Sequence, residues 1–202
     1  MRALALLAFA AFSLGTSAFA QVIGPPDSFQ VRYASNLNKG DSYINITNTG
    51  SNHIENPPGT NCIDVYTFDP SEEMVSCCSC VVTPNALVSL SVQGDLISNT
   101  LSPATPANVV IKIVAKNPPG TGTCDPASSA GELVSGIRAW GTTLHALPDG
   151  TYGVTETTFL PGSLSAAEFA HLTSFCGFIN SNGSGFGICK SCRAGGLGGV
   201  KQ

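Results

Sequence analysis

Alternating apolar and polar side chains predict most of the strands in this chain. The alternation, or a β-branched run, covers residues 29–34, 42–47 and 63–68. Because the alternation at 63–68 is strict, we expect one face of that strand to be buried. The segment 109–114, with the sequence VVIKIV, is the most apolar β-branched run after the first 20 residues, which predicts a central strand.

A hairpin and a connection complete the predicted β structure. Residues 137–145 and 150–159 read as two strands joined by the Leu-Pro-Asp-Gly sequence at 147–150, and Asp-Gly tolerates the positive φ of a tight hairpin. Residues 117–126 contain Pro-Pro-Gly and Cys124. This composition predicts an exposed connection that a disulfide fixes at one point.

Three segments carry residues that start helices. The Asp-Pro-Ser-Glu sequence at 69–72 is a capping box, and Thr-Pro at 83–84 repeats the signal, so each predicts a short helix, the second ending near Gly94. The Ser-Ala-Ala-Glu sequence at 165–168 is a further capping box and predicts a helix over 166–180. Its apolar side chains recur on one face: Phe169, Leu172, Cys176 and Ile179.

The N-terminal residues predict export. Arg2 supplies the positive start, residues 3–14 an apolar core, and Ala18-Phe19-Ala20 a cleavage site, so residues 1–20 are predicted to be a secretory signal peptide. That core is shorter than the roughly 18 residues of a spanning helix, and no later apolar segment reaches this length. We therefore expect an exported protein, periplasmic or extracellular, with no membrane span.

The domain organisation follows from these patterns. Residues 21–180 are predicted to form one β-rich, disulfide-stabilised domain, and residues 181–202 a Gly/Ser-rich tail that its cysteines tether. The expected fold class is mainly β: an antiparallel β-sandwich-like domain with two or three short helices, stapled by disulfides.

Charge narrows the range of partners. Only 11% of the residues are charged, and removal of Arg2 with the signal peptide leaves eight basic residues against 13 acidic ones. This acidic balance disfavours nucleic acid as a partner. A polar surface of hydroxyls and amides is common in exported β proteins. The partner stays open, an extracellular or cell-surface protein is one candidate, and no cofactor is expected.

Eight cysteines are expected to form up to four disulfides in an oxidising compartment. They are Cys62, Cys77, Cys78, Cys80, Cys124, Cys176, Cys189 and Cys192. The connectivity stays open, although short loops favour Cys62 with the cluster at 77–80, and Cys176 with Cys189 or Cys192. Each such bond contributes about 3 kcal/mol of a typical stability of about 5–15 kcal/mol, so reduction should weaken or unfold the domain.

Two C-x-x-C sequences, at 77–80 and 189–192, allow other chemistry. Four thiolates could hold zinc, but the two pairs lie far apart in the sequence and four cysteines would remain over, so no metal is predicted. Thiol exchange at Cys189 and Cys192 needs a stabilised thiolate, usually at a helix N-terminus. The glycine-rich sequence that follows opposes a helix, which leaves only Lys190 and Arg193 to favour the thiolate.

Other catalytic patterns are missing from the sequence. It contains no phosphate-binding glycine loop, H-E-x-x-H, G-x-S-x-G or EF-hand sequence. Capping and solvation explain the acidic residues Asp64, Asp69, Glu72 and Glu73. The three histidines, His53 in a loop, His145 at a strand end and His171 in the predicted helix, are interpreted as structural because the sequence gives them no defined partner.

Two segments resemble known groups. Residues 147–156, LPDGTYGVTE, resemble a hairpin of prealbumin-like and other immunoglobulin-like repeats in bacterial surface proteins, where in some domains the glutamate assists a lysine isopeptide bond. No lysine or partner is assigned to that chemistry here. The sequences VSCCSC at 75–80 and GICKSCR at 187–193 resemble uncharacterised bacterial exported proteins, which implies a compartment and no activity.

Three functional hypotheses follow. The leading one is an exported, non-catalytic structural or binding module of unknown ligand. The second is a thiol-redox or metal-binding protein that uses Cys189 and Cys192, which requires free or metal-bound thiols. The third is a secreted hydrolase, which requires His145 or His171 beside a carboxylate and a hydroxyl in a cleft.

Overall fold

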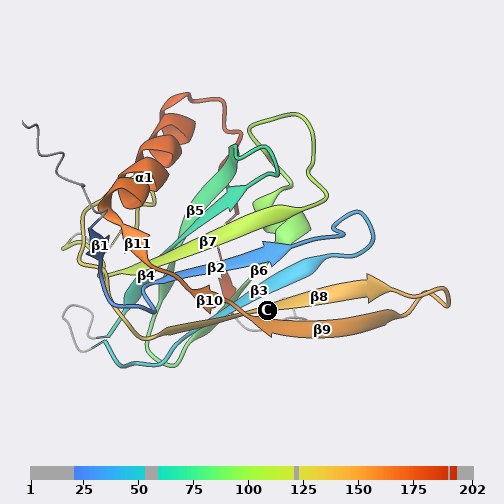
Figure 1. Ribbon diagram of the computed structural model, residues 1–202, viewed down its shortest axis with the longest axis horizontal. Helices are drawn as coiled ribbons and strands as arrows, with labels where there is room; N and C mark the ends of the chain where they lie inside the picture. Colours follow the sequence, from blue (N-terminus) through green and yellow to red (C-terminus); the bar gives the residue numbers. More distant parts are fainter. Residues whose placement is uncertain (1–20, 53–58, 121–122, 191, 195–202) are drawn as a thin grey trace, which may run out of the picture.

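The computed structural model describes residues 21–52, 59–120, 123–190 and 192–194. The predicted signal peptide and His53 lie outside this range, as does the tail beyond residue 194. The described chain is mainly β, and two five-stranded antiparallel sheets form a sandwich (Figure 1). The predicted fold class is therefore confirmed. Within the described residues, no helix is both long and apolar enough to cross a membrane.

The first sheet, which we call the helix-covered sheet, has the strand order β10-β2-β7-β4-β5. In that order its strands are Leu160–Pro161, Phe29–Ala34, Val109–Lys116, Asn61–Phe68 and Met74–Val82. The predicted central strand is β7, in the middle of this sheet. Its position explains the apolar run, because both faces of a central strand are buried.

The second sheet, which we call the open sheet, has the strand order β12-β6-β3-β8-β9. In that order its strands are Arg193–Ala194, Leu87–Ser91, Ser42–Asn48, Ile137–Ala146 and Tyr152–Thr158. β8 and β9 form the predicted hairpin, whose tip extends past the rest of the sandwich (Figure 1). Gly150 has φ +83° in its turn, as the Asp-Gly pair predicts.

Apolar side chains from both sheets fill the space between them. Ile44 and Ile46 of β3 face Ile63 and Val65 of β4, together with Ile111 of β7, and all five are fully buried. Because side chains alternate along a strand, the residues between these on β3 point to the outer face of the open sheet.

One helix covers the outer face of the helix-covered sheet. It is α1, Ala166–Ser181, which follows the short paired strands β1 (Val22–Ile23) and β11 (Leu164–Ser165). The predicted capping box starts it, since Ser165 Oγ accepts a hydrogen bond from the backbone N of Glu168 at 3.1 Å. The four side chains predicted for one face are all buried there: Phe169, Leu172, Cys176 and Ile179.

Because α1 covers its outer face, β4 is buried on both faces, and the prediction of one buried face is wrong. The alternation at 63–68 indicates a strand with one buried face, but every residue from Asn61 to Phe68 is buried. Ile63 and Val65 face the open sheet, whereas Tyr66 and Phe68 lie beneath α1. The polar positions of β4 therefore need partners inside the protein.

Two predicted short helices are wrong. Residues 69–72 form the turn between β4 and β5, in which Asp69 Oδ1 accepts hydrogen bonds from the backbone N of Ser71 and of Glu73. The same carboxylate geometry that caps a helix here closes a hairpin turn. Residues 87–91 form strand β6, and the π-helical turn η1 (Val92–Leu96) follows it.

The chain closes the two long edges of the sandwich differently. At one edge, which we call the crosslinked edge, the backbone of residues 187–189 bonds to Cys77 of β5, and β12 then pairs with β6 of the open sheet. At the other, the crossover edge, the chain leaves β9 at Thr158 and enters β10, which pairs with β2. Each edge is thus closed by one segment that passes between the sheets.

Candidate functional site

All eight cysteines are paired in four disulfides. The pairs, with their Cα–Cα distances, are Cys62–Cys124 (5.4 Å), Cys77–Cys176 (5.9 Å), Cys78–Cys189 (5.3 Å) and Cys80–Cys192 (5.6 Å). These separations are typical of disulfides. Every bond starts on β4 or β5, so the covalent crosslinks all belong to the helix-covered sheet.

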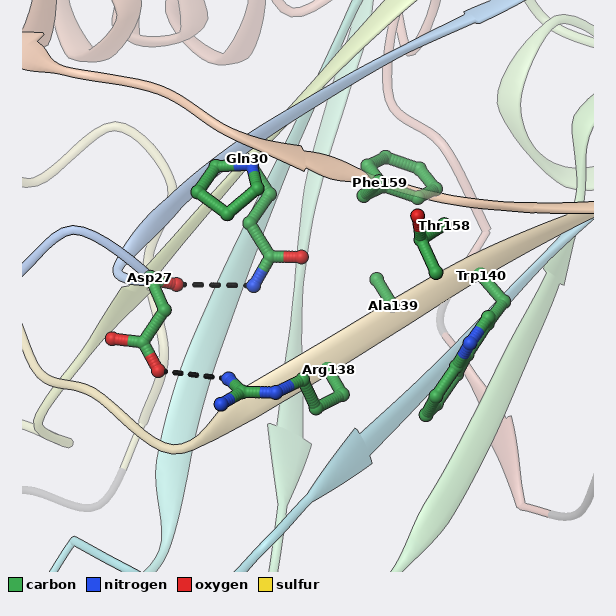
Figure 2. A pocket seen from close by; sticks show the side chains of 8 residues that line it. Asp27, Gln30, Arg138, Ala139, Trp140, Thr158 and Phe159 are labelled. Carbon is green, nitrogen blue, oxygen red and sulfur yellow. Dashed lines mark hydrogen bonds and ion pairs between the residues drawn. The ribbon is translucent and has the colours of Figure 1, made fainter.

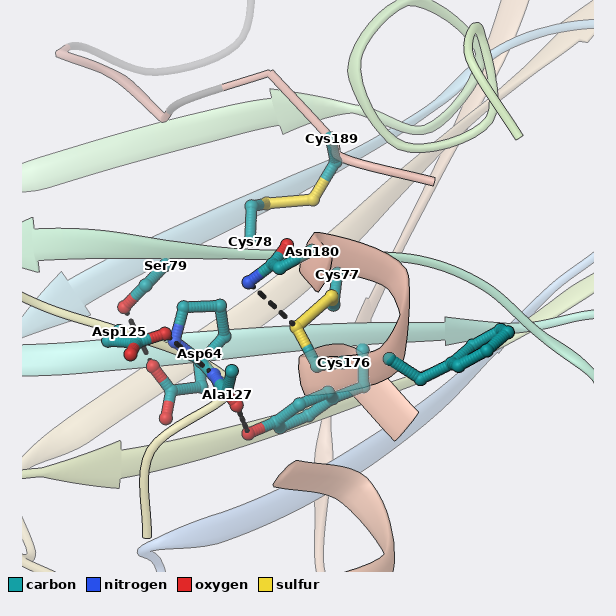
Figure 3. The surroundings of a disulfide bond; sticks show 12 residues. Asp64, Cys77, Cys78, Ser79, Asp125, Ala127, Cys176, Asn180 and Cys189 are labelled. Atoms are coloured by element: carbon teal, nitrogen blue, oxygen red, sulfur yellow. Dashed lines mark hydrogen bonds between the residues drawn. A yellow bond between two sulfur atoms is a disulfide. The ribbon is translucent and has the colours of Figure 1, made fainter. Parts of the chain in front are cut away.

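The predicted short-range pairings are wrong. Cys62 does not bond to the cluster at 77–80, and Cys176 bonds to neither Cys189 nor Cys192. Figure 3 shows the reason: neighbouring residues of β5 point to opposite faces, so Cys77 meets Cys176 of α1 while Cys78 meets Cys189 of the tail. The strand geometry, which sequence separation does not reveal, decides the partners.

The C-x-x-C sequences therefore do not form a thiol pair. Cys189 and Cys192 each bond to a different cysteine of β5. Across residues with a described placement, no three His, Cys, Asp or Glu side chains are grouped so that they could hold a metal ion.

The two described histidines, His145 and His171, lie outside the pocket described below. His145 Nε2 is 3.0 Å from Thr155 Oγ1 on the exposed β8–β9 hairpin. His171 Nδ1 is 3.8 Å from Glu168 Oε2 on the surface of α1, and its ring contacts Phe175 edge-on. Neither arrangement supplies both the carboxylate and the hydroxyl that a hydrolase triad needs.

A buried ion pair crosses the helix-covered sheet. Lys116 Nζ lies 2.8 Å from Asp64 Oδ2, and both side chains are at most 1% exposed. Burial raises the pKa of Asp64 to about 6, although Lys116 opposes this shift. Ser79 Oγ on β5 donates a further hydrogen bond to Asp64 Oδ1 at 2.7 Å. The pair links three strands of this sheet.

The same ion pair holds the loop that follows β7. Lys116 Nζ donates to the backbone oxygens of Asp125 and Ser128 at 2.7 and 2.6 Å, and the Tyr66 hydroxyl donates to the backbone oxygen of Pro126 at 2.8 Å. With Cys62–Cys124, these contacts fix the loop, as predicted for a connection stapled at one point. Three acceptors satisfy the ammonium of Lys116, which is the pattern of a structural cation.

The outer face of the open sheet carries a row of hydrogen-bonded polar side chains, and no described helix lies on it. Ser89 Oγ donates to Asn45 Oδ1 at 2.7 Å, and Asn45 Nδ2 donates to Thr142 Oγ1 at 3.1 Å. Thr142 Oγ1 then donates to Glu156 Oε1 at 2.9 Å. The row crosses β6, β3, β8 and β9, so the hairpin glutamate singled out in the sequence has a structural partner in this row.

A buried arginine binds the two sheets together near the crossover edge. Arg32 of β2 donates to Ser42 Oγ and Thr143 Oγ1, each at 2.9 Å, and to Thr157 Oγ1 at 3.2 Å. A Cβ at Gly141 would collide with its guanidinium, so glycine is needed there. Burial lowers the pKa of Arg32. Hydrogen bonds from Arg32 to hydroxyls therefore join the two sheets near the crossover edge, whereas disulfides fix the tail at the crosslinked edge.

A pocket of about 250 Å³, which we call the crossover notch, opens where β9 leaves the open sheet. Its wall is made of four polar and four apolar residues: Asp27, Gln30, Arg138, Thr158, Ala139, Trp140, Phe159 and Pro161. Its volume is slightly below the ~300–1,000 Å³ of drug-sized ligand sites. Two of its lining residues are joined by a backbone hydrogen bond, from Phe159 N to the oxygen of Ala139 at 2.9 Å, just after β9 ends.

Planar side chains surround this notch (Figure 2). Arg138 Nη1 lies 2.9 Å from Asp27 Oδ2, which also accepts from the backbone N of Gly136 at 3.1 Å. Gln30, only 3% exposed, donates from Nε2 to the backbone oxygens of Asp27 and Ile137 at 3.1 and 3.2 Å. The indole of Trp140 is half-buried on β8.

Sequence reasoning did not identify this notch. Its residues come from three separate segments, and none belongs to a recognised motif. The single tryptophan of the chain, Trp140, was the one available signal, because tryptophan on an exposed sheet position is often part of a contact surface.

In comparisons with known proteins, no protein-family model, curated protein or solved structure matches this chain.

Proposed function

We propose that this protein is an exported, non-catalytic module that acts by binding, with the crossover notch as its contact site. The observation that carries the proposal is the notch itself: a preformed pocket of fixed polar groups beside an indole, at the edge where the chain passes from the open sheet to the helix-covered sheet. Preformed pockets with a few placed polar groups are the usual form of a binding site.

The sulfur chemistry supports a binding role. Four disulfides are typical of proteins in oxidising compartments, which agrees with export. Because Cys189 and Cys192 are bonded to two different cysteines of β5, reduction of both bonds would detach the tail from the sheet. Such bonds suit a staple better than a reversible redox couple.

A direct test adds the labelled mature chain, from Gln21 onward, back to the cells that produce it. We expect retention of the wild type and its loss in Thr158→Arg, since an arginine at this exposed position fills the notch. The matched control is Ser181→Arg, an exposed position at the end of α1, which should be retained. Equal behaviour of the two variants, or no retention of the wild type, would contradict the proposal.

A second measurement addresses catalysis. Thiol titration of the unreduced protein in denaturant should find no free thiol, and insulin reduction, esterase, peptidase and glycosidase assays should show no turnover. A turnover that a single change such as His171→Asn abolishes would replace the binding role with an enzymatic one.

A further inference from the structure

The groups lining the crossover notch fit one chemical class of ligand. We propose that the notch binds a neutral saccharide unit, which deepens the binding role proposed above and rests on it. Such a ligand presents hydroxyls that both donate and accept around its edge, and C–H groups on its faces.

Gln30 supplies a fixed acceptor. Its Nε2 points to two backbone carbonyl oxygens, those of Asp27 and Ile137. Only the amide nitrogen can donate to two carbonyls, so the orientation of the carboxamide is set and Oε1 must point the other way. Figure 2 shows Oε1 directed into the notch, toward Thr158, and the described residues offer it no hydrogen bond. An acceptor without a protein partner at the wall of a pocket is a group to which a ligand can donate a hydrogen bond.

Arg138 and Asp27 supply donors and acceptors without net charge. Their ion pair engages one nitrogen of the guanidinium and one oxygen of the carboxylate. The side chain of Arg138 is 55% exposed, so its remaining N–H groups are accessible. Because the two charges neutralise one another, an ionic ligand would meet one opposite and one like charge, whereas a neutral polyol can bond to both groups.

The apolar residues of the notch supply the other half of the recognition. Trp140 and Pro161 provide flat apolar surfaces beside the polar groups, next to the buried ring of Phe159. A purely apolar ligand would bury Gln30 Oε1 without a hydrogen bond, at a cost of about 1–3 kcal/mol. A ring with both hydroxyl edges and C–H faces satisfies the two kinds of wall together.

The protein carries its own reporter for this test, because Trp140 is the only tryptophan of the chain. The experiment titrates the mature protein with cellotetraose, xylotetraose, mannotetraose, galactotetraose and chitotetraose while following tryptophan emission. We expect at least one neutral tetrasaccharide to change the emission saturably, with a dissociation constant of about 1 mM or tighter. A tetragalacturonate, which carries carboxylates on the same kind of ring, should bind at least about tenfold more weakly.

Two variants assign the binding to the notch. Gln30→Met removes Oε1 at nearly constant volume and should weaken binding about tenfold, as should Thr158→Val. Val154→Thr, on the exposed face of the same strand but outside the notch, should bind as the wild type does. Because Gln30→Met also loses two hydrogen bonds, its thermal unfolding is measured alongside, and Thr158→Val gives the result if that variant fails to fold.

The inference is overturned if none of the five neutral saccharides changes the emission at about 20 mM, if tetragalacturonate binds most tightly, or if Val154→Thr weakens binding as much as Thr158→Val. These failures are distinct from failure of the binding role. Loss of cell retention in Thr158→Arg without saccharide binding keeps the binding role and removes the saccharide, whereas turnover removes the binding role.

Discussion

The two edges of the sandwich are closed by chain segments that cross between the sheets, but only one of the segments is covalently fixed. At the crosslinked edge the tail is bonded to β5 through Cys78–Cys189 and Cys80–Cys192. At the crossover edge the passage from β9 to β10 carries no cysteine and is held by backbone bonds, the hydroxyls around Arg32 and the packing of Phe159. The pocket lies at the second edge, where no disulfide ties the two sheets together.

This difference separates stability from binding. Disulfides fix a segment that would otherwise be too short and too rich in glycine to hold itself in place. In the proposed binding role the notch needs accessible polar groups, and β2, β8 and the segment before β2 supply most of them where the chain crosses between the sheets. The same contrast appears in the ion pairs, since Asp64–Lys116 is buried near the crosslinked edge and Asp27–Arg138 is exposed at the crossover edge.

The largest expected effect comes from the packing of the crossover edge. Phe159→Ala removes a buried ring between the sheets and should lower the free energy of unfolding by about 3–5 kcal/mol, measured by urea denaturation. Phe178→Ala is the control, because that ring on α1 is exposed, and it should change stability by less than about 1 kcal/mol. Similar losses in the two variants would show that Phe159 does not hold the edge.

The crosslinked edge should respond to the loss of both bonds more than to the loss of one. With Cys77–Cys176 intact, Cys78–Cys189 closes an extra loop of about 14 residues, so removing both tail bonds should cost at least about 3 kcal/mol. That variant carries alanine at Cys78, Cys80, Cys189 and Cys192. Removing only Cys80–Cys192 should cost about 2 kcal/mol, because with Cys78–Cys189 intact it closes a loop of only about seven residues. Equal losses from the single and the double removal would contradict this view.

The buried ion pair Asp64–Lys116 should make the free energy of unfolding depend on pH, by an amount similar to that of the disulfide removal. The pKa of Asp64 is raised from 3.8 to about 6 in the folded protein, so between these values the folded state keeps a proton that the unfolded state has lost. The stability contributed by protonated Asp64 is present below about pH 4 and is lost as the pH rises through about 6, a change of about 3 kcal/mol.

Urea titrations from pH 4 to pH 7 measure this dependence. The difference in unfolding free energy between the wild type and Asp64→Asn should fall by about 2 kcal/mol across that range, since asparagine does not titrate. A difference that stays constant with pH would show that Asp64 does not titrate between these limits.

The exposed ion pair at the crossover edge should have the smallest effect. Arg138→Gln breaks the contact with Asp27, but solvent screens this pair, so the free energy of unfolding should change by less than about 1 kcal/mol. The measurement is the urea midpoint in low and high salt. A loss as large as that of Phe159→Ala would mean that the notch is built for stability rather than for a ligand.

The local sequence pattern correctly predicted those strands and helices whose burial in the fold matches the pattern. The alternation at 42–47, the apolar run at 109–114 and the Asp-Gly hairpin each appear as strands, because the open sheet and the centre of the helix-covered sheet impose the burial that the pattern implies. The capping box at 165–168 likewise starts α1, where a long apolar face follows it. At 69–72 the same box lacks that face and becomes a hairpin turn.

The candidate site was not predictable in this way. Cys77 and Cys78 are adjacent in sequence but face α1 and the sandwich interior, so their partners depend on which elements lie over each face of β5. The notch depends on the place where β9 changes sheets, which brings Gln30 of β2 beside Trp140 of β8. Both features arise from long-range topology, on which the periodicity of a single segment carries no information.

The disulfide pattern of the unreduced mature protein, determined by mass spectrometry, tests the account most directly. Trypsin separates Cys189 from Cys192 after Lys190. Partial reduction with stepwise alkylation resolves the bonds of Cys62, Cys77, Cys78 and Cys80, which all fall on one peptide. We expect the bonds Cys62–Cys124, Cys77–Cys176, Cys78–Cys189 and Cys80–Cys192, with no free thiol. A Cys189–Cys192 bond, or free thiols at these positions, would contradict it and favour thiol chemistry at the tail.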